Sequence, residues 1–243
     1  MAVAHDAASE SAVSTSAASF SWTHVGGGSA RGAIVFVISI QGTGDDTSVT
    51  YGGTGMALIG SGSDTDTEPG TIRCYYLDNV ATGSQTVLVN RVNDATQMMG
   101  MAATVTAGSA TEAYAAGRVT TGGSSQNTGA DTSGTGTAAN AEVAVDDGSP
   151  GVASVRYAAC YTGAASPPSA GASSTLLNNH DFTAFGWTMV VETTAGQGSR
   201  SVGTTSGADD RAGVHIAVRE PSPPAPPEAP YPFVGGGYYP EQG

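Results

Sequence analysis

The four histidines of this protein could each act as an acid, a base or a metal ligand, and they are scattered along the sequence. His5, His24, His180 and His215 share no short spacing with one another or with the two cysteines. The sequence contains no G-x-S-x-G, H-E-x-x-H or P-loop motif. We therefore expect a protein without enzymatic activity and without catalytic residues. A catalytic pair of carboxylates, as in glycoside hydrolases, remains an alternative, because residues that are close only in the folded protein leave no pattern in a single sequence.

Residues 178–181 read Asn-Asn-His-Asp, which sets His180 directly beside a carboxylate. Adjacent side chains point opposite ways on an extended chain, so a strand would separate the two. We predict a turn at residues 178–181 that leads into a strand over 182–192. For His24, the pattern favours a partly buried strand residue over a metal ligand.

Asp64, Asp66 and Glu68 lie at alternate positions of a loop and are the best metal candidates in the chain. Carboxylate oxygens are ligands that Ca²⁺ prefers. The loop lacks the glycine and the distal glutamate of an EF-hand loop, however, and acidic loop residues of an acidic protein are usually solvated. We expect no metal and no cofactor, with Ca²⁺ at these three residues as the alternative.

The two cysteines lie in apolar, strand-like surroundings. Cys74 and Cys160 lack the paired spacing of a metal site, so buried free thiols are the first interpretation and a disulfide is the second. The methionines at positions 98, 99 and 101 are interpreted as core residues rather than as a redox or copper site.

The charge balance is strongly acidic, with 8 Arg, no Lys and 21 acidic residues, for a formal net charge of −13. Nucleic acid and anionic membranes would repel such a chain, so neither is an expected partner. The charge suits an exposed, multi-copy protein, and a compositional bias of the genome or a halophilic source explains it equally well. The N-terminus has no basic and apolar leader pattern, and no segment approaches ~18 consecutive apolar residues. We expect neither secretion by a signal peptide nor a membrane span.

The longest apolar run, AIVFVISI at residues 33–40, predicts a central strand covered on both faces. Phe20, Trp22 and His24 alternate with small residues and line one face of a first strand. A hairpin of residues 48–51 with 56–59 is predicted around Gly52 and Gly53. Further strands are predicted at 71–77, 86–92, 98–105, 113–119 (an edge), 142–145, 153–161, 182–192, 200–205 and 213–219.

The Gly/Ser/Thr-rich tract at 120–138 is predicted to be an exposed loop, or alternatively a boundary between two domains. The first half alone would leave its sheet faces uncovered, so a single all-β, jelly-roll-like β-sandwich over residues 19–220 is the simpler arrangement. Residues 1–18 are small and polar, and we expect them to run extended along a surface or an edge.

Residues 221–243 form a segment of different character, which we call the arm. It carries eight of the twelve prolines and is expected to adopt polyproline II before a glycine hinge. It also holds Tyr231, Phe233, Tyr238 and Tyr239, side chains of the kind that anchor interfaces. These four are the predicted partner-binding residues; the alternative is a tail whose aromatic residues are incidental.

The order of these features carries a resemblance to a known group. FSWTHV is followed by a glycine-rich turn with Arg31, then AIVFVISI, SVTYGGTGM, TIRCYYL, a Thr-Gly turn, TVLVNRV and the closing AGVHIAVRE. Over about residues 18 to 220 this resembles the jelly-roll-like β-sandwich proteins of tailed-phage structural modules and prophages. The chain departs from that pattern after Arg31, where Gly-Ala-Ile stands in place of the usual Leu-Leu.

The resemblance implies a non-enzymatic virion protein, either a capsid decoration protein or a minor tail protein. It would be made in the host cytoplasm and reside in the virion, with capsid or tail subunits and further copies of itself as partners. The alternative is a carbohydrate- or receptor-binding module that recognises a host-surface glycan. That function would require exposed aromatic platforms such as Trp187 or Tyr157.

Overall fold

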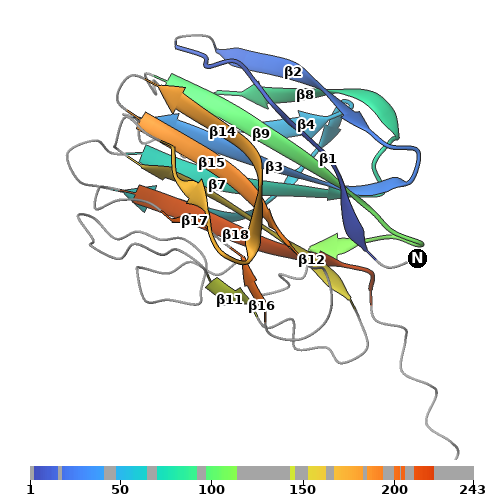
Figure 1. Cartoon of the computed structure of the whole chain (residues 1–243). Helices are drawn as coiled ribbons and strands as arrows, with labels where there is room; N and C mark the ends of the chain where they lie inside the picture. The colour runs from blue at the N-terminus through green and yellow to red at the C-terminus, as the bar shows by residue number, and fades with distance from the viewer. Residues whose placement is uncertain are drawn as a thin grey trace, which may run out of the picture.

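All regular elements in the described part of the chain are β-strands (Figure 1), which confirms the prediction of an all-β fold. The computed structural model describes residues 3–15, 18–40, 48–64, 70–91, 97–113, 143–145, 153–162, 167–182, 185–193, 200–202, 204–205 and 211–221. None of these residues forms an apolar helix of membrane-spanning length.

The strands form antiparallel sheets. The central sheet has the order β1-β9-β3-β7-β6 and consists of β1 (Ala4–Glu10), β9 (Gln97–Thr106), β3 (Ala30–Ile40), β7 (Gly70–Asp78) and β6 (Ala57–Asp64). The C-terminal sheet has the order β10-β18-β12-β15-β14 and consists of β10 (Glu112–Ala113), β18 (Arg211–Arg219), β12 (Ser154–Thr162), β15 (Phe185–Glu192) and β14 (Ser174–Phe182).

A third, smaller sheet has the order β2-β8-β4-β5, and we call it the outer sheet. It consists of β2 (Ser19–Gly26), β8 (Gly83–Asn90), β4 (Ser48–Tyr51) and β5 (Thr54–Gly55). Two further pairs are β11 (Val143–Val145) with β16 (Arg200–Val202), and β13 (Ser169–Ala170) with β17 (Thr204–Thr205).

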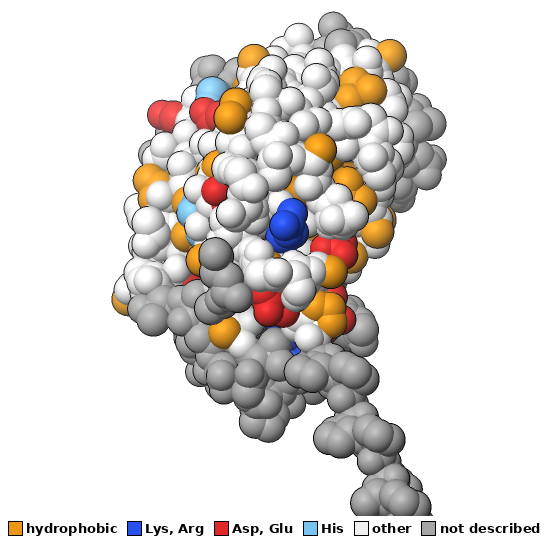
Figure 2. Space-filling model, turned by 90° about the vertical axis from the view of Figure 1, so that its right-hand side faces the viewer, with side chains coloured by type: hydrophobic (Ala, Val, Ile, Leu, Met, Phe, Trp, Pro, Cys, Tyr) orange, Lys and Arg blue, Asp and Glu red, His pale blue; other side chains and the backbone are white. Residues whose placement is uncertain are grey.

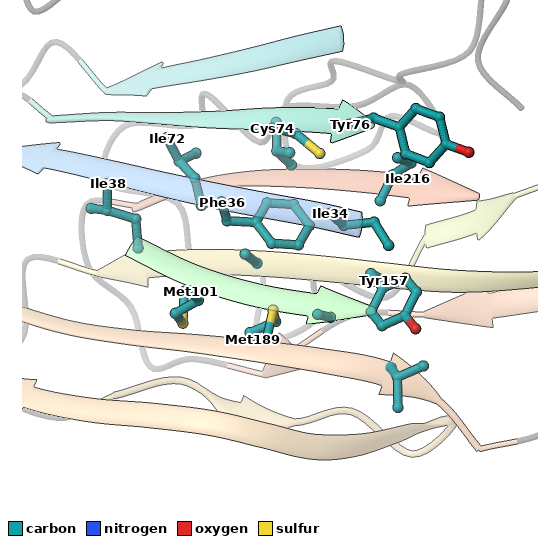
Figure 3. Packing of buried hydrophobic residues seen from close by; sticks show 14 of the residues in the cluster. Ile34, Phe36, Ile38, Ile72, Cys74, Tyr76, Met101, Tyr157, Met189 and Ile216 are labelled. Atoms are coloured by element: carbon teal, nitrogen blue, oxygen red, sulfur yellow. The ribbon is translucent and has the colours of Figure 1, made fainter. Parts of the chain in front are cut away.

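The central strand β3 is covered on both faces, as its unbroken apolar run predicts. Ile34, Phe36 and Ile38 join a core cluster with residues of the C-terminal sheet, among them Met189 and Ile216 (Figure 3). The alternate residues Val35 and Val37 join a second cluster with the outer sheet. The central sheet is therefore the middle layer of three, and the two five-stranded sheets form the β-sandwich.

The predicted hairpin turn at Gly52 and Gly53 is present, but the second strand of the hairpin is β5 and not residues 56–59. β4 turns back at Gly52 and Gly53, both at positive φ, into the two-residue strand β5, and its other side pairs with β8. From Ala57 the chain crosses to the central sheet and pairs with β7 as far as Asp64. This longer ladder satisfies more backbone groups than an extended hairpin at the edge of the outer sheet would.

The predicted turn at residues 178–181 is wrong, because these residues belong to β14. The strand predicted over 182–192 is in fact the second of two paired strands, since β14 ends at Phe182 and β15 begins at Phe185. Among the strands that the structure describes, β14 pairs on one side only, with β15, and many of its side chains are partly exposed. Such a strand can carry polar residues that read as a turn in the sequence.

The N-terminal segment contains β1, which forms one edge of the central sheet by pairing with β9. Cys74 and Cys160 are buried free thiols, as predicted. The tract at 120–138 and most of the edge predicted at 113–119 lie outside the described residues.

Candidate functional site

Most of the predicted site residues lie outside the part of the chain that the structure describes. This applies to Tyr231, Phe233, Tyr238 and Tyr239 of the arm, and to Asp66 and Glu68 of the acidic loop. Asp64 is the last residue of β6. Among the described residues, no group of three His, Cys, Asp or Glu side chains is arranged to hold a metal ion.

The two aromatic residues considered as sugar platforms are buried. Trp187 is 1% exposed and Tyr157 is 0% exposed, and both belong to the core between the central and C-terminal sheets. His180 stacks on Trp187 with ring centroids 5.4 Å apart. Neither Trp187 nor Tyr157 can therefore present a ring to a glycan in this structure.

Polar side chains do converge beneath β1, where they connect the central and outer sheets. Trp22 Nε1 donates to Ser9 Oγ at 3.0 Å, and Ser9 Oγ lies 2.8 Å from His24 Nδ1. His24 Nε2 lies 3.1 Å from Thr104 Oγ1, which in turn donates to Asp6 Oδ2 at 2.9 Å. We call Trp22, Ser9, His24, Thr104 and Asp6 the N-terminal hydrogen-bond chain.

The groups at the two ends of the N-terminal hydrogen-bond chain limit which of its members can donate and which can accept. The indole N–H of Trp22 can only donate, and an ionised Asp6 carboxylate can only accept. The Ser9 hydroxyl accepts from Trp22, and when His24 is neutral it donates to His24 Nδ1, which leaves the imidazole proton on Nε2. That proton is donated to Thr104 Oγ1, and Thr104 donates to Asp6.

A β-bulge at Asp6 makes this arrangement possible. The pairing of β1 with β9 shifts between His5 and Ala7, so Asp6 is the extra residue. On a regular strand Asp6 and Ser9, three positions apart, would point to opposite faces. The inserted residue lets both side chains reach the outer-sheet side, where Asp6 Oδ2 also accepts the N–H of Gly27 at 2.7 Å.

The opposite face of β1 makes a polar contact with the C-terminal sheet. His5 Nδ1 lies 3.0 Å from the hydroxyl oxygen of Tyr157, and the two rings meet edge to face at 5.7 Å. Burial lowers the pKa of both His5 and His24, and the nearby Asp6 carboxylate opposes this effect in part. Both histidines therefore favour the neutral form in the folded protein.

A Ser–His pair that leads to an aspartate invites comparison with a hydrolase triad, but the geometry does not suit nucleophilic catalysis. His24 is 0% exposed, so it cannot exchange protons with a bound substrate. The hydroxyl of Ser9 is engaged by Trp22 and His24, and a threonine stands between the histidine and the carboxylate. The arrangement instead ties β1 to β2 and β9.

The sequence interpretation placed His24 correctly on an inward face of its strand, but it missed Asp6 and Ser9. These two residues lie in the segment AHDAASE, which has neither apolar alternation nor a motif. Their role depends on the bulge, which a single sequence does not reveal.

A second polar grouping lies where the last strand ends, and we call residues 108–112 with 219–220 the arm root. Arg219 Nε contacts Glu112 Oε1 at 2.7 Å. One carboxylate oxygen of Glu220 accepts the backbone N–H groups of Gly108, at 2.5 Å, and Ser109, at 3.3 Å. The end of β18 is thus held against the loop before β10.

The same loop is also tied to the central sheet, because the backbone N–H and the hydroxyl of Thr111 both donate to Asp78, at 2.7 and 2.8 Å. Figure 2 shows the molecule from a side on which acidic side chains gather near an arginine while most of the described surface is uncharged.

Comparisons of the chain with models of protein families, with curated proteins and with solved structures find no match.

Proposed function

We propose that this chain is a non-enzymatic structural protein of a tailed-phage virion, either a capsid decoration protein or a minor tail protein. In this proposal the sandwich is the exposed body, and the arm attaches it to neighbouring virion subunits or to further copies of the chain. The resemblance over residues 18 to 220 supports the setting, and the all-β sandwich agrees with the fold it implies.

The observation that carries the proposal is the arm root. Glu220, one residue before the first proline of the arm, is held by two backbone N–H groups, and Arg219 is held by Glu112. β18 itself lies inside the C-terminal sheet between β10 and β12. A force that pulls on the arm would act on β18, which is hydrogen-bonded to a strand on each side. The arm root is therefore better suited to a segment that attaches the protein to a partner than to an unattached tail.

The composition of the arm fits the same role. From Pro221 to Pro230, a polyproline II segment at ~3.1 Å per residue would extend ~30 Å, enough to reach an adjacent subunit. Tyr231, Phe233, Tyr238 and Tyr239 follow this spacer and would fill pockets on the partner. Proline has already restricted φ along the spacer, which reduces the entropy lost when the arm is ordered.

The polar groups of the sandwich support a structural role rather than a chemical one. The N-terminal hydrogen-bond chain joins strands of two sheets, with its histidine buried. The acidic surface charge keeps a protein soluble when many copies are crowded together. We propose that the protein works without a metal or cofactor.

Mass spectrometry of virions tests this function directly. Particles induced from a strain that carries the gene would be purified on a density gradient, and the chain would be quantified against the major capsid protein. We expect a fixed copy number per particle that survives repeated purification. Recovery of the chain only from the soluble fraction, or specific binding to a glycan array by the purified chain, would contradict the proposal.

A further inference from the structure

β1 is an edge strand that pairs with β9 through its backbone and contributes mainly polar side chains, while Ala8 and the preceding Val3 pack on the core. It pairs with β9 on one side, and its sequence AHDAASE contains no apolar side chain larger than alanine. Three of its residues, His5, Asp6 and Ser9, make side-chain hydrogen bonds to β12, β9 and β2. The attachment of this strand therefore depends in part on the protonation states of its partners.

The titratable groups around the two histidines come from several elements. β1 contributes Asp6, β12 contributes Tyr157 and β4 contributes Tyr51, and a charge on His5 also lowers the pKa of His24. The neighbouring β8 and β9 contribute the neutral side chains of Gln85, paired in register with His24, and Thr104. Farther along β1, Glu10 interacts with His180 of β14. Asp6 is thus the negative charge closest to both histidines.

Protonation of His24 would disturb the N-terminal hydrogen-bond chain. A charged imidazole donates from both nitrogens, so Nδ1 could no longer accept the proton of Ser9. The Ser9 hydroxyl would then receive donors from Trp22 and His24 and would need a new acceptor for its own proton. His5 is partly buried, so a charge on it would be partly desolvated beside the hydroxyl of the buried Tyr157. Each change weakens the hold on β1.

We propose that β1 is an acid-released strand: protonation of His5 and His24 detaches residues 4–10 from the central sheet while the rest of the sandwich stays folded. Release exposes the backbone edge of β9 and opens one side of both core clusters. The core between the sheets survives because its large side chains come from β3, β7, β9, β12, β15 and β18.

The direction of the pH effect follows from burial. The pKa of each histidine lies below 6.5 in the folded protein, whereas a detached β1 would return each toward 6.5. Above that pH neither state binds protons. As the pH falls below 6.5, the detached state gains protons more readily than the folded state does, which favours release by at most about 30-fold per histidine at pH 5 and at most about 10³-fold for both.

Hydrogen–deuterium exchange of the full chain at pH 7.5 and pH 5, corrected for the intrinsic exchange rate, tests this proposal. We expect the protection of the β1 amides that bond to β9 to fall, by at most about 10³-fold, while protection in β3 changes little. The variant His5→Gln should show a smaller fall, and the control Ser21→Ala, at an exposed position of β2, should retain the full response.

Equal loss of protection in β1 and β3 would mean global unfolding and would overturn the proposal, as would unchanged protection of β1 at pH 5. If a histidine variant folds poorly, an NMR titration of the unmodified chain decides the matter. The imidazole signals of His5 and His24 should then titrate together with the loss of the β1 amide signals. Titration with the β1 amide signals intact would contradict release.

Discussion

His24 Nδ1 lies 2.8 Å from the hydroxyl oxygen of Ser9, and the two residues belong to different sheets. Ser9 is on the N-terminal edge strand of the central sheet, and His24 is on β2 of the outer sheet. The contact is buried on the histidine side, so its loss leaves a polar atom without water.

Replacement of Ser9 by alanine should therefore destabilise the protein. Both His24 Nδ1 and Trp22 Nε1 would lose their partner, and the unsatisfied buried group on His24 alone costs about 1–3 kcal/mol. Urea denaturation measures the loss. The matched control is Ser21→Ala at an exposed position of β2, with an expected effect within about 0.5 kcal/mol. Equal stability of the two variants would show that the hydrogen-bond chain contributes little.

Two substitutions in β3 should differ sharply although both residues are buried. Phe36→Ala should cost about 3–5 kcal/mol through lost burial and a cavity between the sheets. Ser39→Ala should cost little or stabilise slightly, because the buried Ser39 hydroxyl has no hydrogen-bond partner among the described residues. Thermal melts compare the two, and an unchanged midpoint for Phe36→Ala would contradict the assignment of β3 as the core strand.

Chelation should leave the melting temperature unchanged, because we expect no resident metal at Asp64, Asp66 and Glu68. The measurement is a thermal melt with and without EDTA, followed by addition of Ca²⁺. The variant Asp64→Asn with Asp66→Asn is the control and should behave like the unmodified chain. A drop of several degrees on chelation that Ca²⁺ alone restores, and that this variant lacks, would reveal a calcium site in the loop.

The fold was predictable where burial leaves a pattern. β3 is apolar along its length because it is covered on both faces, and the run at residues 33–40 shows this directly. β2 alternates Phe20, Trp22 and His24 with small residues because one of its faces packs on the central sheet. The third layer was not foreseen, since alternation shows that a face is covered and not which sheet covers it.

The elements that the sequence predicted least well are edge strands, although residues 1–18 were expected to run extended along a surface or an edge. In the described part of the chain, β1 and β14 each pair on one side only, so few of their side chains need to be apolar. Asn178, Asn179 and His180 read as a turn although their backbone pairs with β15. The sequence did not indicate the roles of Asp6 and Ser9. Their separation along the chain does not place them on one face of a strand; the β-bulge does.

Truncation after Glu220 tests the central claim, that the arm attaches an independently folded sandwich to the virion, most directly. The truncated chain should melt like the full chain, because the described core ends at β18 and the arm root is retained. Its occupancy on particles stripped of the native protein should fall sharply. A full-length variant with Tyr231, Phe233, Tyr238 and Tyr239 changed to serine should fall equally if the aromatic residues are the anchors. Full occupancy by the truncated chain would contradict the account and would place attachment on the sandwich surface instead.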